Sequence, residues 1–186
     1  MRFKGNVIEN KLRDRIMELE EEYGTEISTT QKILLCEHGP LTTLLDVLYG
    51  EVYLFILDQH LEEADEEIAE LLQMDAGDEI DYREVIVHKN GRPLVYTLSY
   101  IPTSRCSEEI FEDLMNERLT TGRIIDKNVI ETFITIKNIS IEKPSPTLKE
   151  LFKTDECMLC REYIITHNKE IGIWTKEAYP LSYFKV

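Results

Sequence analysis

One block of this sequence occurs twice, and the repetition limits what the chain can fold into. Residues 82–102, YREVIVHKNGRPLVYTLSYIP, align with residues 160–180, CREYIITHNKEIGIWTKEAYP, without a gap when the chain is shifted by 78 positions. The shift places Arg83 on Arg161. A fold that accommodates this sequence must therefore contain the same local structure twice.

Two shorter blocks repeat at the same shift. Residues 41–43 match residues 119–121, and residues 55–56 match residues 133–134. Matches at one constant shift in three separate blocks indicate an internal duplication. The chain is predicted to hold two copies of one unit, about residues 40–102 and 118–180, within a single domain of residues 1–186.

Each unit is centred on a predicted β-hairpin. Runs rich in β-branched and aromatic residues flank a polar turn, which is Asn90-Gly91 in the first unit, a strong hairpin signal. The second unit has Asn168-Lys169 there, which leaves its turn type open. Another β-rich run precedes each hairpin, at residues 52–59 and 129–141. Three strands in each unit predict a six-stranded antiparallel sheet, in which each unit buries its apolar face against the other.

Helical patterns lie between these strands and predict an α+β fold. Much of the acid lies in residues 62–79, where residues 61–73, LEEADEEIAELLQ, read as one amphipathic helix with a solvated carboxylate face. The other predicted helices cover residues 11–23, 40–48, 107–116, 119–126 and 147–152.

Composition excludes several classes of function. The net charge of −15 argues against nucleic-acid binding, which needs a basic face. No apolar run is long enough to span a membrane and no signal peptide is recognisable, so we expect a cytoplasmic protein. Four cysteines in 186 residues are too few for a disulfide scaffold. Cys157 and Cys160 have CxxC spacing, but we interpret them as ordinary thiols because no second ligand pair accompanies them, and we expect no metal site.

Two ionisable residues stand in apolar strand rows. Arg83 shares a strand face with Val85 and Val87, and Glu177 shares one with Ile173 and neighbouring apolar residues. A charged group in such a row is costly unless it is paired or used. One interpretation is a shared buried site near the axis between the units. The other is that each residue forms a structural ion pair, for example Glu177 with Arg161.

The two LTT segments are further candidates. Thr42-Thr43 and Thr120-Thr121 stand at predicted helix starts, where backbone N–H groups suit an anionic ligand, and Arg123 would add a positive charge. The alternative is that the threonines only cap the helices.

The sequence resembles a known family. The segments LLCEHGPLTTLLD, QMDAGDEIDYREVIVHKNGRPLVYTLSYIP, LTTGRII and WTKEAYP are similar to the chorismate pyruvate-lyases and their archaeal relatives, over about residues 30–184. The effector domains of bacterial winged-helix repressors share that fold. The resemblance implies a six-stranded antiparallel sheet with helices packed on one side and an internal ligand cavity.

The resemblance also implies roles for particular residues. Arg83 would hold a substrate carboxylate and Glu177 would contact the ring hydroxyl as the candidate catalytic residues. Backbone groups of Leu41, Thr121 and Gly122 would line the substrate site. The implied reaction converts chorismate, a dianion, to 4-hydroxybenzoate and pyruvate, with no cofactor.

The sequence is also compatible with a non-catalytic function, the binding of a small molecule. The same fold serves as a non-catalytic domain that binds an aromatic acid or a sugar phosphate. Such domains are normally fused to a winged helix. Here the residues before the resembling region contain one acidic helix, so we expect no winged helix and favour the enzyme.

Overall fold

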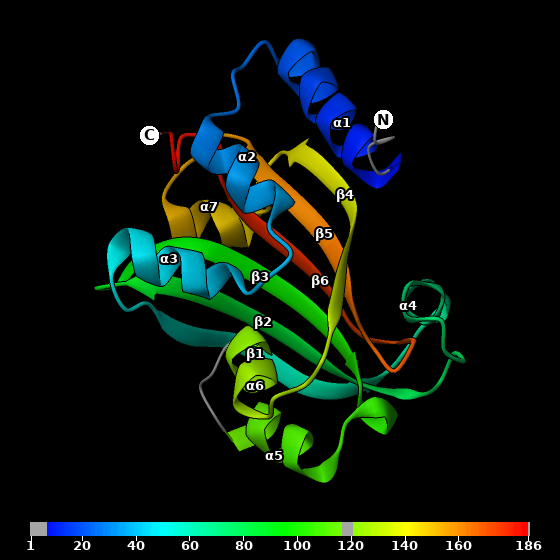
Figure 1. Cartoon of the computed structure of the whole chain (residues 1–186). Coiled ribbons are helices and arrows are strands. Elements are labelled where there is room, and N and C mark those ends of the chain that lie inside the picture. Colours follow the sequence, from blue (N-terminus) through cyan, green and yellow to red (C-terminus); the bar gives the residue numbers. More distant parts are fainter. Residues whose placement is uncertain (1–6, 117–120, 186) are drawn as a thin grey trace.

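Six antiparallel strands form the sheet of this protein, in the order β1-β2-β3-β6-β5-β4 (Figure 1). The structure is a computed structural model and describes residues 7–116 and 121–185. Each repeat contributes a three-stranded meander, and the two meanders join where β3 pairs with β6. The predicted sheet is thus confirmed. Its strands are β1 (Tyr53–Glu63), β2 (Glu79–Lys89), β3 (Arg92–Pro102), β4 (Phe133–Glu142), β5 (Met158–His167) and β6 (Glu170–Pro180).

The two hairpin turns have the same backbone conformation. Asn90 and Gly91 have φ values of 51° and 78°, and Asn168 and Lys169 have 51° and 71°. Positive φ at both central residues is characteristic of a type I′ turn, whose twist matches that of the flanking strands. The second turn, left open by the sequence, therefore copies the first although a lysine occupies the glycine position.

Within the described residues, five helices lie on one face of the sheet and share an apolar core with it. Buried side chains of all five contribute to this core, together with inward residues of the sheet such as Val95 and Ile136. Figure 1 shows α3 and α6 in front of the strands of the first repeat. These helices are α1 (Val7–Tyr23), α2 (Thr29–Cys36), α3 (Leu41–Tyr49), α5 (Glu108–Asn116) and α6 (Thr121–Lys127).

The prediction that the helices pack on one side is wrong for two short helices. Ala69 and Leu72 of α4 (Glu66–Leu72) pack against Trp174, and Phe152 of α7 (Pro146–Phe152) packs against Met158, on the opposite face of the sheet. Both helices are needed there because β5 and β6 carry apolar side chains on both faces. A strand buried on both faces requires cover on each.

Two predicted boundaries also shift. The acidic stretch is not one helix, because β1 continues to Glu63 and the helix begins only after Asp65, whose side chain accepts a hydrogen bond from the Ile68 N–H. The strand predicted from residue 129 begins at Phe133, since Val129 has φ 51°, which a β-strand does not hold.

Helix α1 covers the outer edge of β4. The Arg15 guanidinium donates to the carbonyl of Ile139 at 3.1 Å, and the Tyr23 hydroxyl donates to the carbonyl of Ile141 at 2.9 Å. An edge strand presents unpaired carbonyls that invite association with other chains, and α1 satisfies two of them. No described helix is both long and apolar enough to cross a membrane.

The shared turn geometry predicts the effect of one substitution. Lys169→Gly removes a side chain from a residue with φ 71° and should raise the free energy of unfolding by about 0.5–1 kcal/mol, after the entropic cost of glycine is subtracted. Urea denaturation measures the change. The reciprocal variant Gly91→Lys should lower the free energy of unfolding by a similar amount, and a destabilised Lys169→Gly protein would contradict the assignment.

Candidate functional site

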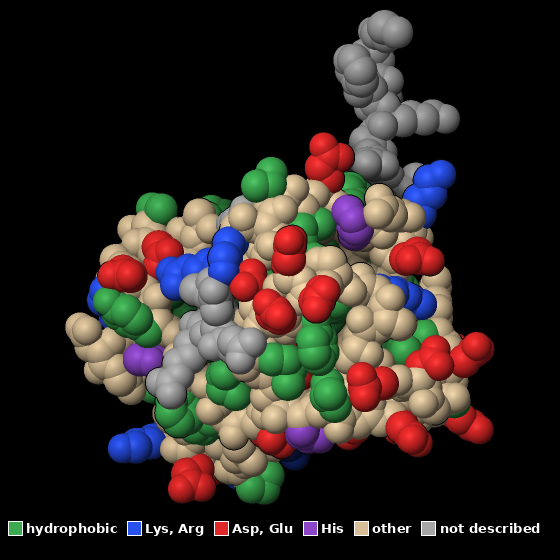
Figure 2. All heavy atoms as spheres, turned by 90° about the horizontal axis from the view of Figure 1, so that it is seen from below, with side chains coloured by type: hydrophobic (Ala, Val, Ile, Leu, Met, Phe, Trp, Pro, Cys, Tyr) green, Lys and Arg blue, Asp and Glu red, His purple; other side chains and the backbone are tan. Residues whose placement is uncertain are grey.

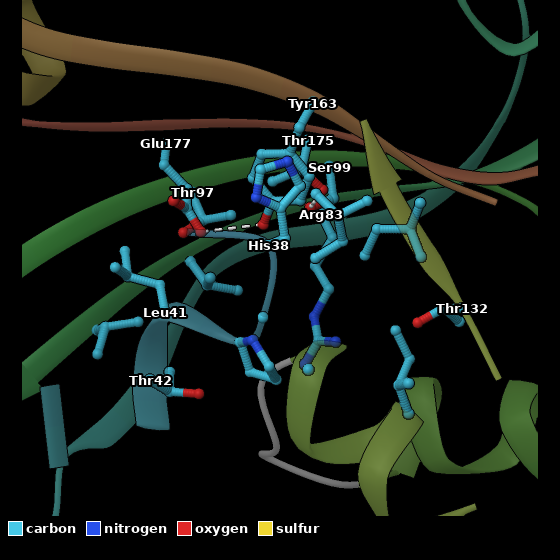
Figure 3. Close-up of a pocket in the computed structure, with 18 of the residues that line it drawn as sticks. His38, Leu41, Thr42, Arg83, Thr97, Ser99, Thr132, Tyr163, Thr175 and Glu177 are labelled. Atoms are coloured by element: carbon cyan, nitrogen blue, oxygen red, sulfur yellow. Dashed lines mark hydrogen bonds between the residues drawn. The ribbon is translucent and has the colours of Figure 1, made fainter. Parts of the chain in front are cut away.

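A cavity of about 230 Å³ lies between the five-helix face of the sheet and the first turns of α3 and α6 (Figure 3). Its walls are mostly aliphatic, and most of its polar side chains come from the four central strands. Both Arg83 and Glu177 line it, so the two residues meet in one cavity as the first interpretation predicted. The aliphatic lining residues are Leu41, Leu54, Val85, Val87, Ile125, Ile130, Ile134 and Ile165, and the polar strand residues beside Arg83 and Glu177 are Thr97, Ser99, Tyr163 and Thr175.

Glu177 is held by two neighbours on β5. The Arg161 Nε donates to one carboxylate oxygen at 2.6 Å, and the Tyr163 hydroxyl donates to the other at 3.0 Å. All three side chains are buried, and Glu177 is 5% exposed. Burial and the Glu177 charge raise the pKa of Tyr163, so its phenol keeps the proton that it donates. The carboxylate is therefore fixed in orientation at the cavity wall.

Arg161 connects this carboxylate to the chain before α3. Its Nη1 donates to the carbonyl of Leu34 at 2.8 Å and to that of Glu37 at 3.0 Å, at the C-terminal end of α2. Burial acts to lower the pKa of Arg161, but the charge and hydrogen bond of Glu177 together with the neighbouring Tyr163 and Tyr179 outweigh it, and the pKa is raised. The ion-pair interpretation is thus also correct for Glu177, which is paired and still faces the cavity.

Arg83 occupies the matching position in the first repeat, with a different neighbour. Arg161 stands opposite Glu177 in the sheet, whereas Arg83 stands opposite Ser99. Arg83 is 2% exposed, and burial lowers its pKa while the charge of Asp81 acts against that change. In Figure 3 the Arg83 guanidinium and the Glu177 carboxylate point to different parts of the cavity. The duplication has therefore produced two buried arginines, one of them facing a carboxylate across the strands.

The helix starts predicted as substrate-binding are brought together only in part. Leu41 and Gly122 both line the cavity. A Cβ added at Gly122 would lie 2.6 Å from the Pro40 Cβ, so this close approach of α6 to α3 requires glycine. The side chain of Thr121 and the whole of Thr120 lie outside the described residues.

Arg123 does not belong to the described cavity lining. Its Nη2 pairs with the Asp46 carboxylate at 2.8 Å, and its Nη1 donates to the carbonyl of Val52 at 3.2 Å. These contacts join α6 to the end of α3 and the start of β1. The prediction that Arg123 supplies a substrate-binding charge is corrected accordingly, because its guanidinium faces Asp46.

Sequence reasoning missed several lining residues. Tyr163, Thr97 and Thr175 lie on the same strand faces as Arg83 and Glu177, so the alternation of side chains along the hairpins could have identified them. His38 also lines the cavity, from the loop between α2 and α3. No local pattern identifies it, because only the position of that loop brings it there.

A buried carboxyl group lies beside Arg83 on β2. Asp81 is 1% exposed and accepts hydrogen bonds from the Gln59 amide at 3.1 and 3.0 Å. The same amide nitrogen donates to the carbonyl of Leu114 in α5. Burial raises the pKa of Asp81 to about 6, although Gln59 and Arg83 act to lower it. Among residues 7–116 and 121–185, no three His, Cys, Asp or Glu side chains are grouped so that they could hold a metal ion.

Comparison with known proteins adds a family and a near relative. The model of the family described as "Chorismate pyruvate-lyase Rv2949c-like" matches residues 35–185. A protein of Methanocaldococcus jannaschii named "Putative lyase MJ0807" is 32% identical over 158 residues, which cover 81% of this chain and 78% of that protein. The match to the family model includes all six strands and the cavity residues that they carry.

Solved structures with a similar fold are regulators. The effector domain of PhnF from Mycobacterium smegmatis superposes with a TM-score of 0.62 at 16% identity, covering 76% of this chain and 88% of that domain. A GntR-family transcriptional regulator from Bacillus cereus gives a TM-score of 0.60 at 14% identity, covering 73% of this chain and 95% of that one. At such identities the likeness shows the fold alone.

The contacts of Arg161 predict a large loss of stability when it is removed. Arg161→Met leaves the Glu177 carboxylate buried without its cation and should lower the free energy of unfolding by about 3–5 kcal/mol. The double variant Arg161→Met with Glu177→Met should recover much of that loss, since it removes both charges. Urea denaturation of the three proteins measures this. A single variant within 1 kcal/mol of the parent would contradict the role given to the pair.

The raised pKa of Asp81 predicts a pH dependence of stability. Between about pH 4 and pH 6 the folded protein keeps a proton that the unfolded chain releases, so this carboxyl group lowers the free energy of unfolding as the pH rises. The loss is fully developed above pH 6 and amounts to about 2–3 kcal/mol for two pKa units. In Asp81→Asn this contribution is absent. The stability of the variant relative to the parent should therefore rise by that amount between pH 4 and pH 7, and parallel pH profiles in urea denaturation would refute the assignment.

Proposed function

Since this chain belongs to the Rv2949c-like chorismate pyruvate-lyase family, we propose that it removes pyruvate from chorismate and leaves 4-hydroxybenzoate. The observation that carries the proposal is that Arg83 and Glu177 reach one cavity from different repeats. This arrangement provides a guanidinium for a ring carboxylate and a fixed carboxylate for a ring hydroxyl.

Charge supports a local binding site for an anionic substrate. The net charge is −15, and Asp and Glu side chains are spread over the face shown in Figure 2. A dianion is repelled by such a surface, so its binding energy must come from groups inside the cavity. A carboxylate about 4 Å from one guanidinium gains roughly 4 kcal/mol at an effective dielectric constant near 20. Arg83, which is 2% exposed, is placed to supply this attraction.

The size and walls of the cavity favour a single-ring acid. An apolar cavity of about 150 Å³ is large enough to bind benzene. The present cavity, at about 230 Å³, leaves space for ring substituents and is smaller than the usual sites for drug-sized ligands. Aliphatic walls can pack on both faces of a ring while polar groups at one end fix its orientation.

The contacts of Glu177 support its predicted contact with the ring hydroxyl. Because the Arg161 Nε and the Tyr163 hydroxyl both donate to this carboxylate, it serves as a hydrogen-bond acceptor in the site. We therefore assign Glu177 to accepting a hydrogen bond from the ring hydroxyl rather than to donating a proton. In the reaction the bond between the ring carbon and the ether oxygen breaks, and its electron pair leaves on the oxygen of enolpyruvate. The neighbouring ring carbon loses a proton, its C–H electron pair completes the aromatic ring, and one proton taken up at the methylene carbon of enolpyruvate gives pyruvate. The ring becomes aromatic, which drives the elimination.

A non-catalytic binding domain is the second candidate function. The observation that favours it is the shared fold of the PhnF effector domain and the GntR-family regulator. In that role the same cavity would bind an aromatic acid or a sugar phosphate without converting it. The polar groups would then fix a ligand, and no bond in it would break.

Incubation of the purified protein with chorismate separates the two functions. Release of 4-hydroxybenzoate and pyruvate, measured by chromatography and by lactate dehydrogenase coupling, is expected of the lyase. Binding of 4-hydroxybenzoate by the folded protein without any product from chorismate would favour the binding domain and remove the lyase proposal.

Arg83 faces Ser99 whereas Arg161 faces Glu177, and this difference predicts the effects of substitutions at Arg83 and Ser99. Arg83→Ala should lower kcat/KM for chorismate roughly 100-fold or more, about 2.7 kcal/mol, because a buried carboxylate would lose its cation. Ser99→Glu places a carboxylate opposite Arg83, as Glu177 stands opposite Arg161, and should cause a similar loss.

Ser99→Gln is the matched control for that experiment. It has the same length as glutamate and no charge, so it should retain at least about 10-fold more activity than Ser99→Glu. Equal activity of the two variants would mean that the positive charge of Arg83 does not contribute to substrate binding.

A further inference from the structure

The loop between α2 and α3 brings an imidazole into the cavity. His38 lines the cavity together with the adjoining Gly39 and Pro40, and Figure 3 shows its ring between Glu177 and Arg83 in that view. His38 is exposed whereas Arg83 is buried, so the histidine stands at the open side of the cavity and the arginine stands inside it.

The loop is held in place by the same arginine that holds Glu177. Arg161 Nη1 donates to the Glu37 carbonyl at 3.0 Å, immediately before His38. The Gly39 N–H donates to the Glu37 carboxylate at 2.7 Å, immediately after it. The position of His38 is therefore fixed relative to the Glu177 carboxylate through one guanidinium.

Arg83 alone cannot bind both carboxylates of a dianionic ligand in this cavity. Among the described lining residues, Arg83 and His38 are the side chains that can carry a positive charge. The charge of Glu177 is balanced by Arg161 behind it. A ring acid with two separated carboxylates can place one of them on Arg83. The second carboxylate must be met by another donor, since an unpaired charge in a dry cavity is costly.

We propose that His38 binds the second carboxylate of a dianionic ring acid, so that the loop forms an anion subsite distinct from Arg83. This inference rests on the proposed function only in taking a dianion as the natural ligand. With the ring carboxylate on the buried Arg83, the ether-linked carboxylate extends toward the open side, where His38 stands. The fragment that leaves in the elimination then carries its carboxylate at the cavity exit.

Two unreactive probes of matched shape test the subsite without any need for turnover. 3-(Carboxymethoxy)benzoate has a second carboxylate on an ether arm, and 3-methoxybenzoate lacks it. Isothermal titration calorimetry at pH 6 gives both dissociation constants for the parent and for each variant. In the parent we expect the dianion to bind more tightly than the monoanion by about 10-fold, which corresponds to 1.4 kcal/mol.

The variants assign that difference to His38. His38→Gln should remove the preference for the dianion and change binding of 3-methoxybenzoate less than about 2-fold, whereas His38→Lys, which places an ammonium group at this position, should preserve the preference. His60→Gln is the control, because His60 lies on the opposite face of the sheet against Tyr82 and should leave both constants unchanged. Circular dichroism establishes that each variant is folded.

The proposal and the proposed lyase activity fail in different ways. A parent protein that binds the two probes equally, or a His38→Gln protein that keeps the preference, overturns the subsite whatever the activity toward chorismate. A protein that prefers the dianion through His38 but yields no 4-hydroxybenzoate retains the subsite and loses the lyase function.

Discussion

The buried contact between Arg161 and Glu177 is the interaction on which the rest of the site depends. The Arg161 guanidinium neutralises the Glu177 carboxylate at the cavity wall. Arg161 is only 2% exposed, so this ion pair is shielded from water. Its Nη1 donates to the carbonyls of Leu34 and Glu37 at the end of α2. A buried pair of this kind adds little net stability by itself. It instead fixes β5, β6 and the loop before α3 in one arrangement.

The duplication explains why the chain has two buried arginines, Arg83 and Arg161. Divergence of the residues opposite them explains why the two arginines differ in their partners. The two hairpins retain the same turn conformation and the same register, so Arg83 and Arg161 occupy equivalent places. The partner across the strands differs, with Ser99 in one repeat and Glu177 in the other. A symmetric scaffold thereby acquires a cavity with a cationic region and an anionic region, which can orient a ring with different substituents.

The fold itself does not separate catalysis from sensing. Regulators with TM-scores near 0.6 share the sheet with this protein at 14–16% identity. The distinction must lie in the few polar side chains that the central strands direct into the cavity, because function resides in sites built on folds. In this chain those side chains include a buried arginine, a paired glutamate and a tyrosine, and the loop before α3 adds a histidine to the same cavity.

The sequence alone determined the duplication, the two hairpins, the six strands and the strand face shared by Arg83 and its apolar neighbours, because side chains alternate with a fixed period along a strand. It could not decide whether Glu177 was paired or facing a cavity, and the structure shows that it is both. Only tertiary packing placed α4 and α7 on the far face, turned Arg123 to Asp46 and brought His38 to the cavity. Those outcomes depend on which segments meet in space, and no local pattern of residues records that.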